Sequence, residues 1–170
     1  KGLLKTAIRD NNPVLFFEHK MEYNKKFLVD DVVEPIPFGK ANVVREGKDI
    51  TIVATSSLVM KSQEAAEKLE KEGISVEVID LRTIVPLDID TVVESVKKTG
   101  KLIVADEAHE RCGVGAEIGF QIMEKAFYYL DAPVGRVNTP NVPLPFSPAL
   151  EFPIIPSVDR IYKKVVEMVK

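Results

Sequence analysis

The sequence predicts an α/β fold of three layers, α/β/α, in which a mostly parallel β-sheet lies between two layers of helices. Short apolar runs alternate with helical stretches of about 12 to 16 residues, which is typical of repeated strand–helix–strand units. The runs are apolar almost throughout, as in strands that are buried on both faces of a sheet. With 170 residues, of which 45% are hydrophobic, the chain can form one domain, or one domain and a fragment of another.

Four apolar runs are expected to form adjacent strands of one sheet: residues 50–54, 76–79, 102–105 and 134–137. Helices are expected between and after them, at residues 58–72, 89–99, 113–130 and 158–169. The boundaries carry residues that commonly begin or end helices, namely Ser56, Ser57, Asp88 and Ser157 at the starts and Gly73 and Gly100 at the ends.

The N-terminal part of the chain is predicted to be a helix followed by a strand. Apolar residues at helical spacing precede Pro13, which ends the helix, and residues 14–17 are predicted to form a buried strand. A helix and a single strand do not make a stable unit alone. This part therefore either docks on the rest of the chain or is the end of a preceding α/β domain. Residues 19–37, which mix charges and end in two prolines, are predicted to be a linker.

Composition excludes several classes of protein. The net charge is −3, from 23 basic and 26 acidic residues, which argues against a general nucleic-acid binder. No apolar stretch approaches the ~18 residues of a membrane span. The single cysteine, Cys112, excludes an internal disulfide framework and is compatible with a reduced cytosolic setting. The chain starts at Lys1 and shows no signal peptide, so we expect that it was cut from a longer protein.

A proline-rich segment, residues 138–156, is expected to run as extended chain over the surface. Seven of the eleven prolines lie between Pro133 and Pro156, and proline cannot pair within a central strand. Its apolar side chains predict a partner surface; they are Val142, Leu144, Phe146, Leu150, Phe152, Ile154 and Ile155. The alternative is that the segment covers the sheet edge of its own domain.

Two motifs have the composition of chemical sites. Gly113, Gly115 and Gly119 resemble a dinucleotide-binding turn, but seven residues separate this turn from the preceding strand and no ribose-binding acid follows. A tight turn and close helix packing are therefore favoured. The polar cluster Asp106–Cys112 contains His109 and Cys112, which could form a metal site or a nucleophile pair, but it has too few ligands for zinc and is interpreted as a polar loop.

The end of the first helix predicts a site for a hard cation. Carbonyl groups at a helix end lack intrahelical partners. The carbonyls of Ala7 and Ile8, with the side-chain oxygens of Asp10 and Asn12, could form an oxygen cage. His19 is interpreted as solvated, and Thr55-Ser56-Ser57 as a helix cap.

Residues 77–88 resemble a signature of the transketolase C-terminal domain. Four further segments, residues 1–13, 113–118, 131–133 and 142–148, resemble the beta subunit of the thiamine-diphosphate-dependent decarboxylating component of 2-oxo acid dehydrogenase complexes. Pyruvate, acetoin and branched-chain members share these segments, so the substrate stays open. The resemblance implies a transketolase C-terminal-like domain over residues 38–170, a linker over 19–37 and a remnant of the pyrimidine-binding domain over 1–18.

The resemblance also implies a division of labour between this part and the rest of the enzyme. Thiamine diphosphate with magnesium, the catalytic glutamate and the substrate histidine are expected outside this chain, which alone should be inactive. Potassium is expected at Ala7, Ile8, Asp10 and Asn12, where one further ligand would come from upstream. The expected partners are the alpha subunit, a second beta subunit and the lipoyl acyltransferase core, and the expected location is the cytoplasm, or the mitochondrial matrix in a eukaryote. The alternative is a stand-alone nucleotide-binding or interaction domain.

Overall fold

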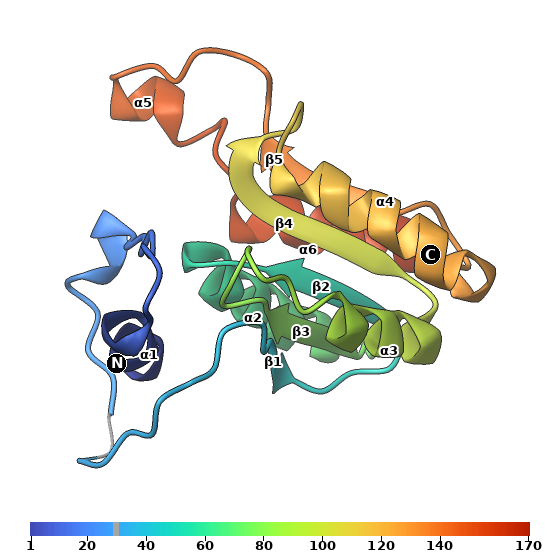
Figure 1. Cartoon of the computed structure of the whole chain (residues 1–170). Coiled ribbons are helices and arrows are strands. Elements are labelled where there is room, and N and C mark those ends of the chain that lie inside the picture. Colours follow the sequence, from blue (N-terminus) through green and yellow to red (C-terminus); the bar gives the residue numbers. More distant parts are fainter. Residues whose placement is uncertain (29–30) are drawn as a thin grey trace.

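The computed structural model describes residues 1–28 and 31–170, and its central feature is a five-stranded sheet in the order β1-β3-β2-β4-β5 (Figure 1). The strands are β1 (Asn42–Arg45), β2 (Ile50–Ala54), β3 (Val76–Asp80), β4 (Leu102–His109) and β5 (Gly135–Thr139). β2, β3, β4 and β5 are parallel, and β1 runs antiparallel beside β3. In the register, Ile52 of β2 lies opposite Val78 of β3 and Ile103 of β4.

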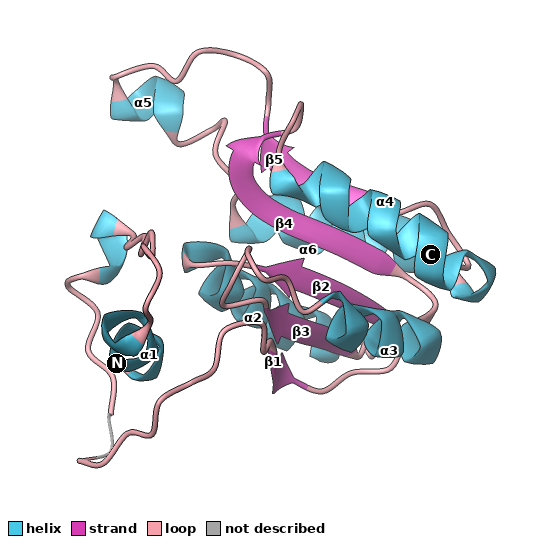
Figure 2. Ribbon diagram, viewed as in Figure 1, coloured by secondary structure: helices cyan, strands magenta, loops and turns pink. Residues whose placement is uncertain are grey.

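Helices cover both faces of the sheet, which confirms the predicted α/β/α fold (Figure 2). α2 (Ser57–Glu70) and α6 (Val158–Val169) pack on one face, and α3 (Ile89–Thr99) and α4 (Val114–Ala126) pack on the other. None of the helices among the described residues is long and apolar enough to cross a membrane.

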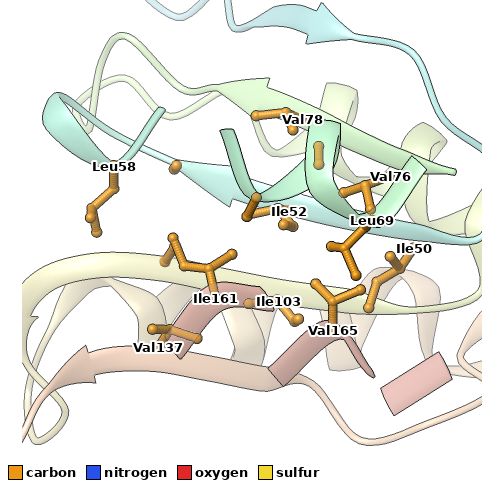
Figure 3. Packing of buried hydrophobic residues seen from close by; sticks show 14 of the residues in the cluster. Ile50, Ile52, Leu58, Leu69, Val76, Val78, Ile103, Val137, Ile161 and Val165 are labelled. Atoms are coloured by element: carbon orange, nitrogen blue, oxygen red, sulfur yellow. The ribbon is translucent and has the colours of Figure 1, made fainter. Parts of the chain in front are cut away.

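The side chains between the sheet and the α2–α6 layer form the larger apolar cluster (Figure 3). Leu58 and Leu69 of α2 and Ile161 of α6 are fully buried against strand residues such as Ile52 and Ile103. The four apolar runs predicted as adjacent strands are neighbours in one sheet, and the helices on its two faces bury most of their side chains.

The predicted helix boundaries agree with the structure at most positions. The Asp88 side chain accepts a hydrogen bond from the Thr91 amide at 3.3 Å, and the Ser157 hydroxyl accepts one from the Arg160 amide at 3.3 Å. Gly100 ends α3 with φ of 69°, a left-handed conformation that suits glycine. Ser56 is the residue before α2, but its side chain makes no capping hydrogen bond.

The predicted strand at residues 14–17 is wrong. α1 (Gly2–Arg9) forms as expected, but Val14–Phe17 has no strand partner, and Leu15 and Phe17 are 85% and 88% exposed. Strand structure needs a neighbouring ladder, and the domain sheet offers none to this segment. The predicted linker contains a 3₁₀ turn, η1 (Lys20–Glu22), and its residues 29–30 lie outside the described part.

Three further elements differ from the predictions. β4 continues to His109 because β5 stays hydrogen-bonded beside it: the Thr139 hydroxyl donates to the Glu107 carbonyl at 2.7 Å. α4 ends at Ala126, followed by a 3₁₀ turn, η2 (Phe127–Tyr129). The proline-rich segment is not extended throughout, since it contains a short helix, α5 (Pro148–Glu151), with proline at its first position.

Candidate functional site

The loops at the carboxyl edge of the sheet contain strained backbone. Ser56, Arg82 and Cys112 have φ of 52°, 60° and 59°, and each lies in the loop that follows a parallel strand, β2, β3 or β4. Residues with side chains seldom adopt this conformation, and such strain concentrates at functional sites. Open α/β sheets also place their sites at the carboxyl ends of strands. The carboxyl edge is therefore the candidate functional region.

Glu107 of β4 is the centre of a polar cluster at this edge. Its Oε1 accepts a hydrogen bond from the Ser57 hydroxyl at 2.6 Å and contacts Lys61 Nζ at 3.4 Å. Its Oε2 lies 2.9 Å from Nε2 of His19. Lys61 also donates to the carbonyl of Pro156 at 3.1 Å. We call His19, Ser57, Lys61 and Glu107 the Glu107 cluster.

Local structure explains how these side chains meet. Ser57 begins α2 and Lys61 lies four residues later, so the two side chains lie on one face of the helix, about one turn apart. β2 and β4 are neighbours, which brings the start of α2 beside the end of β4. His19 comes from the segment before the domain and begins the 3₁₀ turn η1.

The hydrogen bonds of His19 define its tautomer. Its Nδ1 accepts from the Met21 amide at 3.3 Å, so Nδ1 carries no proton. In the neutral ring the proton therefore lies on Nε2, which donates it to Glu107 Oε2. Both imidazole nitrogens are engaged, as are both oxygens of Glu107. The Glu107 cluster thus joins the segment before the domain to α2 and β4 through hydrogen bonds.

The surroundings of Glu107 favour its ionised form. Partial burial alone would raise its pKa, but the Ser57 hydrogen bond and the nearby His19 and Lys61 outweigh burial and lower the pKa below its ordinary value of 4.5. Because the folded pKa is lowered, ionised Glu107 contributes stability above about pH 4.5, and this contribution is lost as the pH falls through the lower folded pKa.

This shift predicts a pH-dependent effect of Glu107→Gln. The variant is expected to be less stable than the unaltered chain near neutral pH, and the difference should shrink once the pH falls well below 4.5. Urea unfolding of both proteins at several pH values measures the difference. Glu110→Gln, which alters an exposed pair with Arg136, is the control. A difference that stays constant across this range would contradict the assigned shift.

The structure places the predicted cation ligands together at the end of α1. The Ala7 carbonyl accepts from the Asp10 amide at 3.4 Å, and Asp10 Oδ1 accepts from the amide and the side chain of Asn12 at 2.8 and 3.0 Å. Ile8 lies in the last turn of the same helix. Asp10 and Asn12 are exposed. Whether Ala7, Ile8, Asp10 and Asn12 hold a cation stays a prediction.

The polar cluster Asp106–Cys112 is mostly strand and not loop. Asp106 to His109 belong to β4, and His109 Nε2 contacts the Val142 carbonyl at 3.1 Å. Cys112 is exposed. Within residues 1–28 and 31–170, no group of three or more His, Cys, Asp or Glu side chains is arranged to hold a metal ion.

Of the two glycines within α4, Gly115 allows close packing of the helix on the sheet and Gly119 does not. A Cβ on Gly115 would lie 3.3 Å from Val104 of β4, so glycine allows a close helix–sheet approach there. At Gly119 a Cβ would make ordinary contact with Val134 at 3.8 Å, so close packing does not explain that glycine. An apolar groove of about 700 Å³ runs along the side of α4 past Phe120, Met123 and Phe127. It follows the flank of the helix, whereas a pyrophosphate would need the amides at the helix start.

Sequence reasoning missed the Glu107 cluster because its members are far apart in the chain. His19 and Glu107 are separated by 88 residues, and no local motif joins them. The sequence does contain one indication of this contact. Ser57 and Glu107 each follow an apolar run, and the carboxyl ends of neighbouring parallel strands lie at the same edge of a sheet.

The structure is an α/β domain with a mostly parallel sheet and one antiparallel edge strand, and its polar cluster lies at the carboxyl edge of that sheet. The chain belongs to the family described as transketolase, C-terminal domain, whose sequence model matches residues 39–161.

Three similar proteins extend this comparison. Over 161 residues the chain is 50% identical to acetoin:2,6-dichlorophenolindophenol oxidoreductase subunit beta of Cupriavidus necator, covering 95% of this chain and 48% of that protein. It is 52% identical over 157 residues to pyruvate dehydrogenase E1 component subunit beta of Rickettsia bellii, covering 92% and 48%. A solved structure, a split gene transketolase in an inactive beta4 tetramer, superposes with a TM-score of 0.72 at 29% identity, covering 85% of this chain and 45% of that one. The chain thus spans about half the length of these relatives.

Proposed function

We propose that this chain is the C-terminal part of the beta subunit of a thiamine-diphosphate-dependent dehydrogenase complex that acts on a 2-oxo acid such as pyruvate, or on acetoin. The whole complex would cleave its substrate oxidatively and transfer the acyl group to lipoyl groups. This part would serve subunit assembly and docking to the acyltransferase core.

The proposal rests on how much of the chain the similarity to these beta subunits covers. The family model matches residues 39–161, whereas similarity to the acetoin enzyme's beta subunit covers 161 residues, 95% of this chain. The likeness therefore extends beyond the domain into the N-terminal segment. Identities of 50% and 52% to acetoin and pyruvate subunits are too close to choose between these substrates.

The proposal assigns the cofactors to different parts of the enzyme. Thiamine diphosphate and magnesium would bind outside this chain, and we assign none of its residues to them. Support for potassium at the end of α1 comes from the oxygen atoms there, which are the carbonyls of the last helical turn and the side-chain oxygens of Asp10 and Asn12. A cation bound by Ala7, Ile8, Asp10 and Asn12 would stabilise the C-terminal end of α1.

This assignment predicts that the chain alone does not bind thiamine diphosphate tightly and does not decarboxylate 2-oxo acids. Isothermal titration with the cofactor and magnesium is expected to show no stoichiometric binding. Tight binding at one site per chain would contradict the assignment of the cofactor to another part. Thermal shift with NAD tests the alternative, a nucleotide-binding domain, because a ligand that binds the folded state raises the melting temperature.

The partner surface is proposed to include the proline-rich segment and α6. Five apolar side chains of the segment are exposed, namely Val142, Leu144, Phe146, Leu150 and Phe152, and Phe146 is fully so. Fully burying one such side chain is worth about 1.5–3 kcal/mol, so contact with a second subunit or with the acyltransferase core would stabilise the assembly.

The same surface predicts self-association of the chain at micromolar concentration. Two copies related by a two-fold axis are the simplest closed arrangement. Replacing Phe146 and Phe152 by serine is expected to shift sedimentation toward the monomer, because both rings are exposed in the isolated chain. A strict monomer before and after the change would contradict the prediction.

The direct test of the proposed function is capture of an alpha subunit. The chain, immobilised, is expected to retain the alpha subunit of a pyruvate or acetoin dehydrogenase, and the serine variant at Phe146 and Phe152 is expected to retain less of it. Leu15→Ser, which alters an exposed apolar residue outside the proposed surface, is the matched control. Failure of the unaltered chain to retain any alpha subunit would contradict the proposed assembly role.

A further inference from the structure

The loop between β5 and α6 projects from the domain and carries α5 (Figure 1). We call residues 143–153 of this loop the arm. Within the part of the chain that the structure describes, the hydrogen bonds of the arm reach only residues 147–155. None of its side chains belongs to the described apolar clusters on the two faces of the sheet. The position of the arm therefore depends mainly on how its two ends are held.

The upstream end of the arm is held at the end of β4 and in the loop after it. His109 Nε2 donates to the Val142 carbonyl at 3.1 Å, and the Arg111 amide donates to Asn141 Oδ1 at 3.0 Å. Residues 143–146 follow, and they make no hydrogen bond with another described residue. Hydrogen bonds on the upstream side therefore stop short of α5.

The downstream end of the arm is continuous with α5. The Glu151 carbonyl accepts hydrogen bonds from the amides of Ile154 and Ile155 at 3.0 and 3.3 Å, which ties these two residues to the last turn of α5. The Ile154 carbonyl in turn accepts from Nη1 of Arg160 at 2.8 Å. A contact that fixes Ile154 therefore also fixes α5.

Arg160 of α6 binds the chain on both sides of the arm. Besides the bond to Ile154, its Nη2 donates to the Asn138 carbonyl of β5 at 2.6 Å. A guanidinium group presents its donors in one rigid plane, so one side chain can hold two carbonyls at a set separation. Lys61 binds the downstream side at the Pro156 carbonyl, which lies beyond Ile154 and farther from α5.

The start of α6 gives Arg160 a rigid base. The Arg160 amide donates to the Ser157 hydroxyl, which caps the helix, and the next residue, Ile161, is fully buried in the core. The backbone of Arg160 is therefore fixed relative to the sheet, and its side chain transmits that position to the arm.

We propose that Arg160 is a clamp that closes the neck of the loop and sets the position of the arm relative to the sheet. When its two bonds are lost, α5 swings together with Ile154 and Ile155 while the domain stays folded. The clamp thereby holds the exposed side chains of Leu150 and Phe152 in one orientation. The clamp rests on the contacts of this chain alone. Its consequence, a lower entropy cost when these side chains contact a partner, rests on the proposed function.

A distance measurement between two spin labels tests the clamp. The native cysteine is removed by Cys112→Ser, and labels are attached to cysteines introduced by Ala149→Cys on α5 and Glu67→Cys on α2, both at exposed positions. An excess of unlabelled chain keeps labels of different copies apart, so the measured distances lie within one chain. This pair is expected to give one narrow distance distribution, and Arg160→Met is expected to replace it by a broad one.

Two further variants separate the clamp from a loss of charge or of folding. Arg160→Lys keeps the positive charge but lacks the planar group, so the distribution should broaden here too, with little change in melting temperature. Lys163→Met removes an exposed cation from the same helix and should keep the narrow distribution. A narrow distribution in either Arg160 variant, equal broadening in Lys163→Met, or broadening that appears only when the domain unfolds would overturn the proposal. Because lysine suits a helix as well as arginine does, Arg160→Lys decides the test even if Arg160→Met folds poorly.

Discussion

Replacing Lys98 by methionine is expected to lower the free energy of unfolding by about 3 kcal/mol, because it leaves a buried carboxylate without its cation. Glu77 of β3 is 1% exposed and binds Lys98, the Ser95 hydroxyl and, at 3.2 Å, the Gly47 amide. After the change, Ser95 and Gly47 still donate, but the charge of Glu77 is no longer balanced in the interior. Urea unfolding at neutral pH measures the loss.

Two variants make this prediction specific to the buried charge. Lys68→Met removes an exposed pair with Glu64 and should cost at most about 1 kcal/mol. Adding Glu77→Gln to Lys98→Met should recover part of the lost stability, because it removes the unpaired charge. If Lys98→Met were no more destabilising than Lys68→Met, the ion pair with Glu77 would not be a stabilising contact.

Ile161→Ala is expected to destabilise the domain by about 2–5 kcal/mol, the range for removing a large aliphatic side chain from a packed core. Ile161 of α6 is fully buried and lies with Leu58 of α2 and Val137 of β5 in the apolar cluster (Figure 3). Neighbours held by the sheet cannot collapse fully into the space that the side chain leaves.

The matched control for the core variant is Leu15→Ala. Leu15 is 85% exposed, so truncating it should change the free energy of unfolding by no more than about 0.5 kcal/mol. Thermal and urea unfolding of both variants, followed by circular dichroism, measure the two changes. Equal losses in Ile161→Ala and Leu15→Ala would show that α6 is not packed on the sheet as described.

Residues with strong local signals behaved as predicted. Asp88 and Ser157 begin helices with their side chains bonded to backbone amides, and Gly100 ends one in the left-handed conformation. These outcomes depend on the few residues on either side, so they can be read from sequence. The order of the apolar runs likewise predicted the parallel strands.

Strand pairing was harder to predict than helix ends. β1 (Asn42–Arg45) was missed because it is a four-residue, partly exposed edge strand with only two valines as its signal. The run at residues 14–17 has a stronger apolar signal and yet forms no strand. The difference is that β1 has the edge of β3 beside it and Val14–Phe17 has no described strand beside it.

By itself, the sequence determined the three-layer class, the four parallel strands and the ends of most domain helices, since these follow from apolar periodicity and from capping within a few residues. Only the tertiary structure decided the antiparallel edge strand, the exposed state of residues 14–17 and the meeting of His19 with Glu107. Each of these depends on whether a distant segment offers a hydrogen-bond partner. The partner becomes available only when the chain folds. His19 and Glu107 are 88 residues apart, and the residues between them must form the sheet edge before the two side chains can meet.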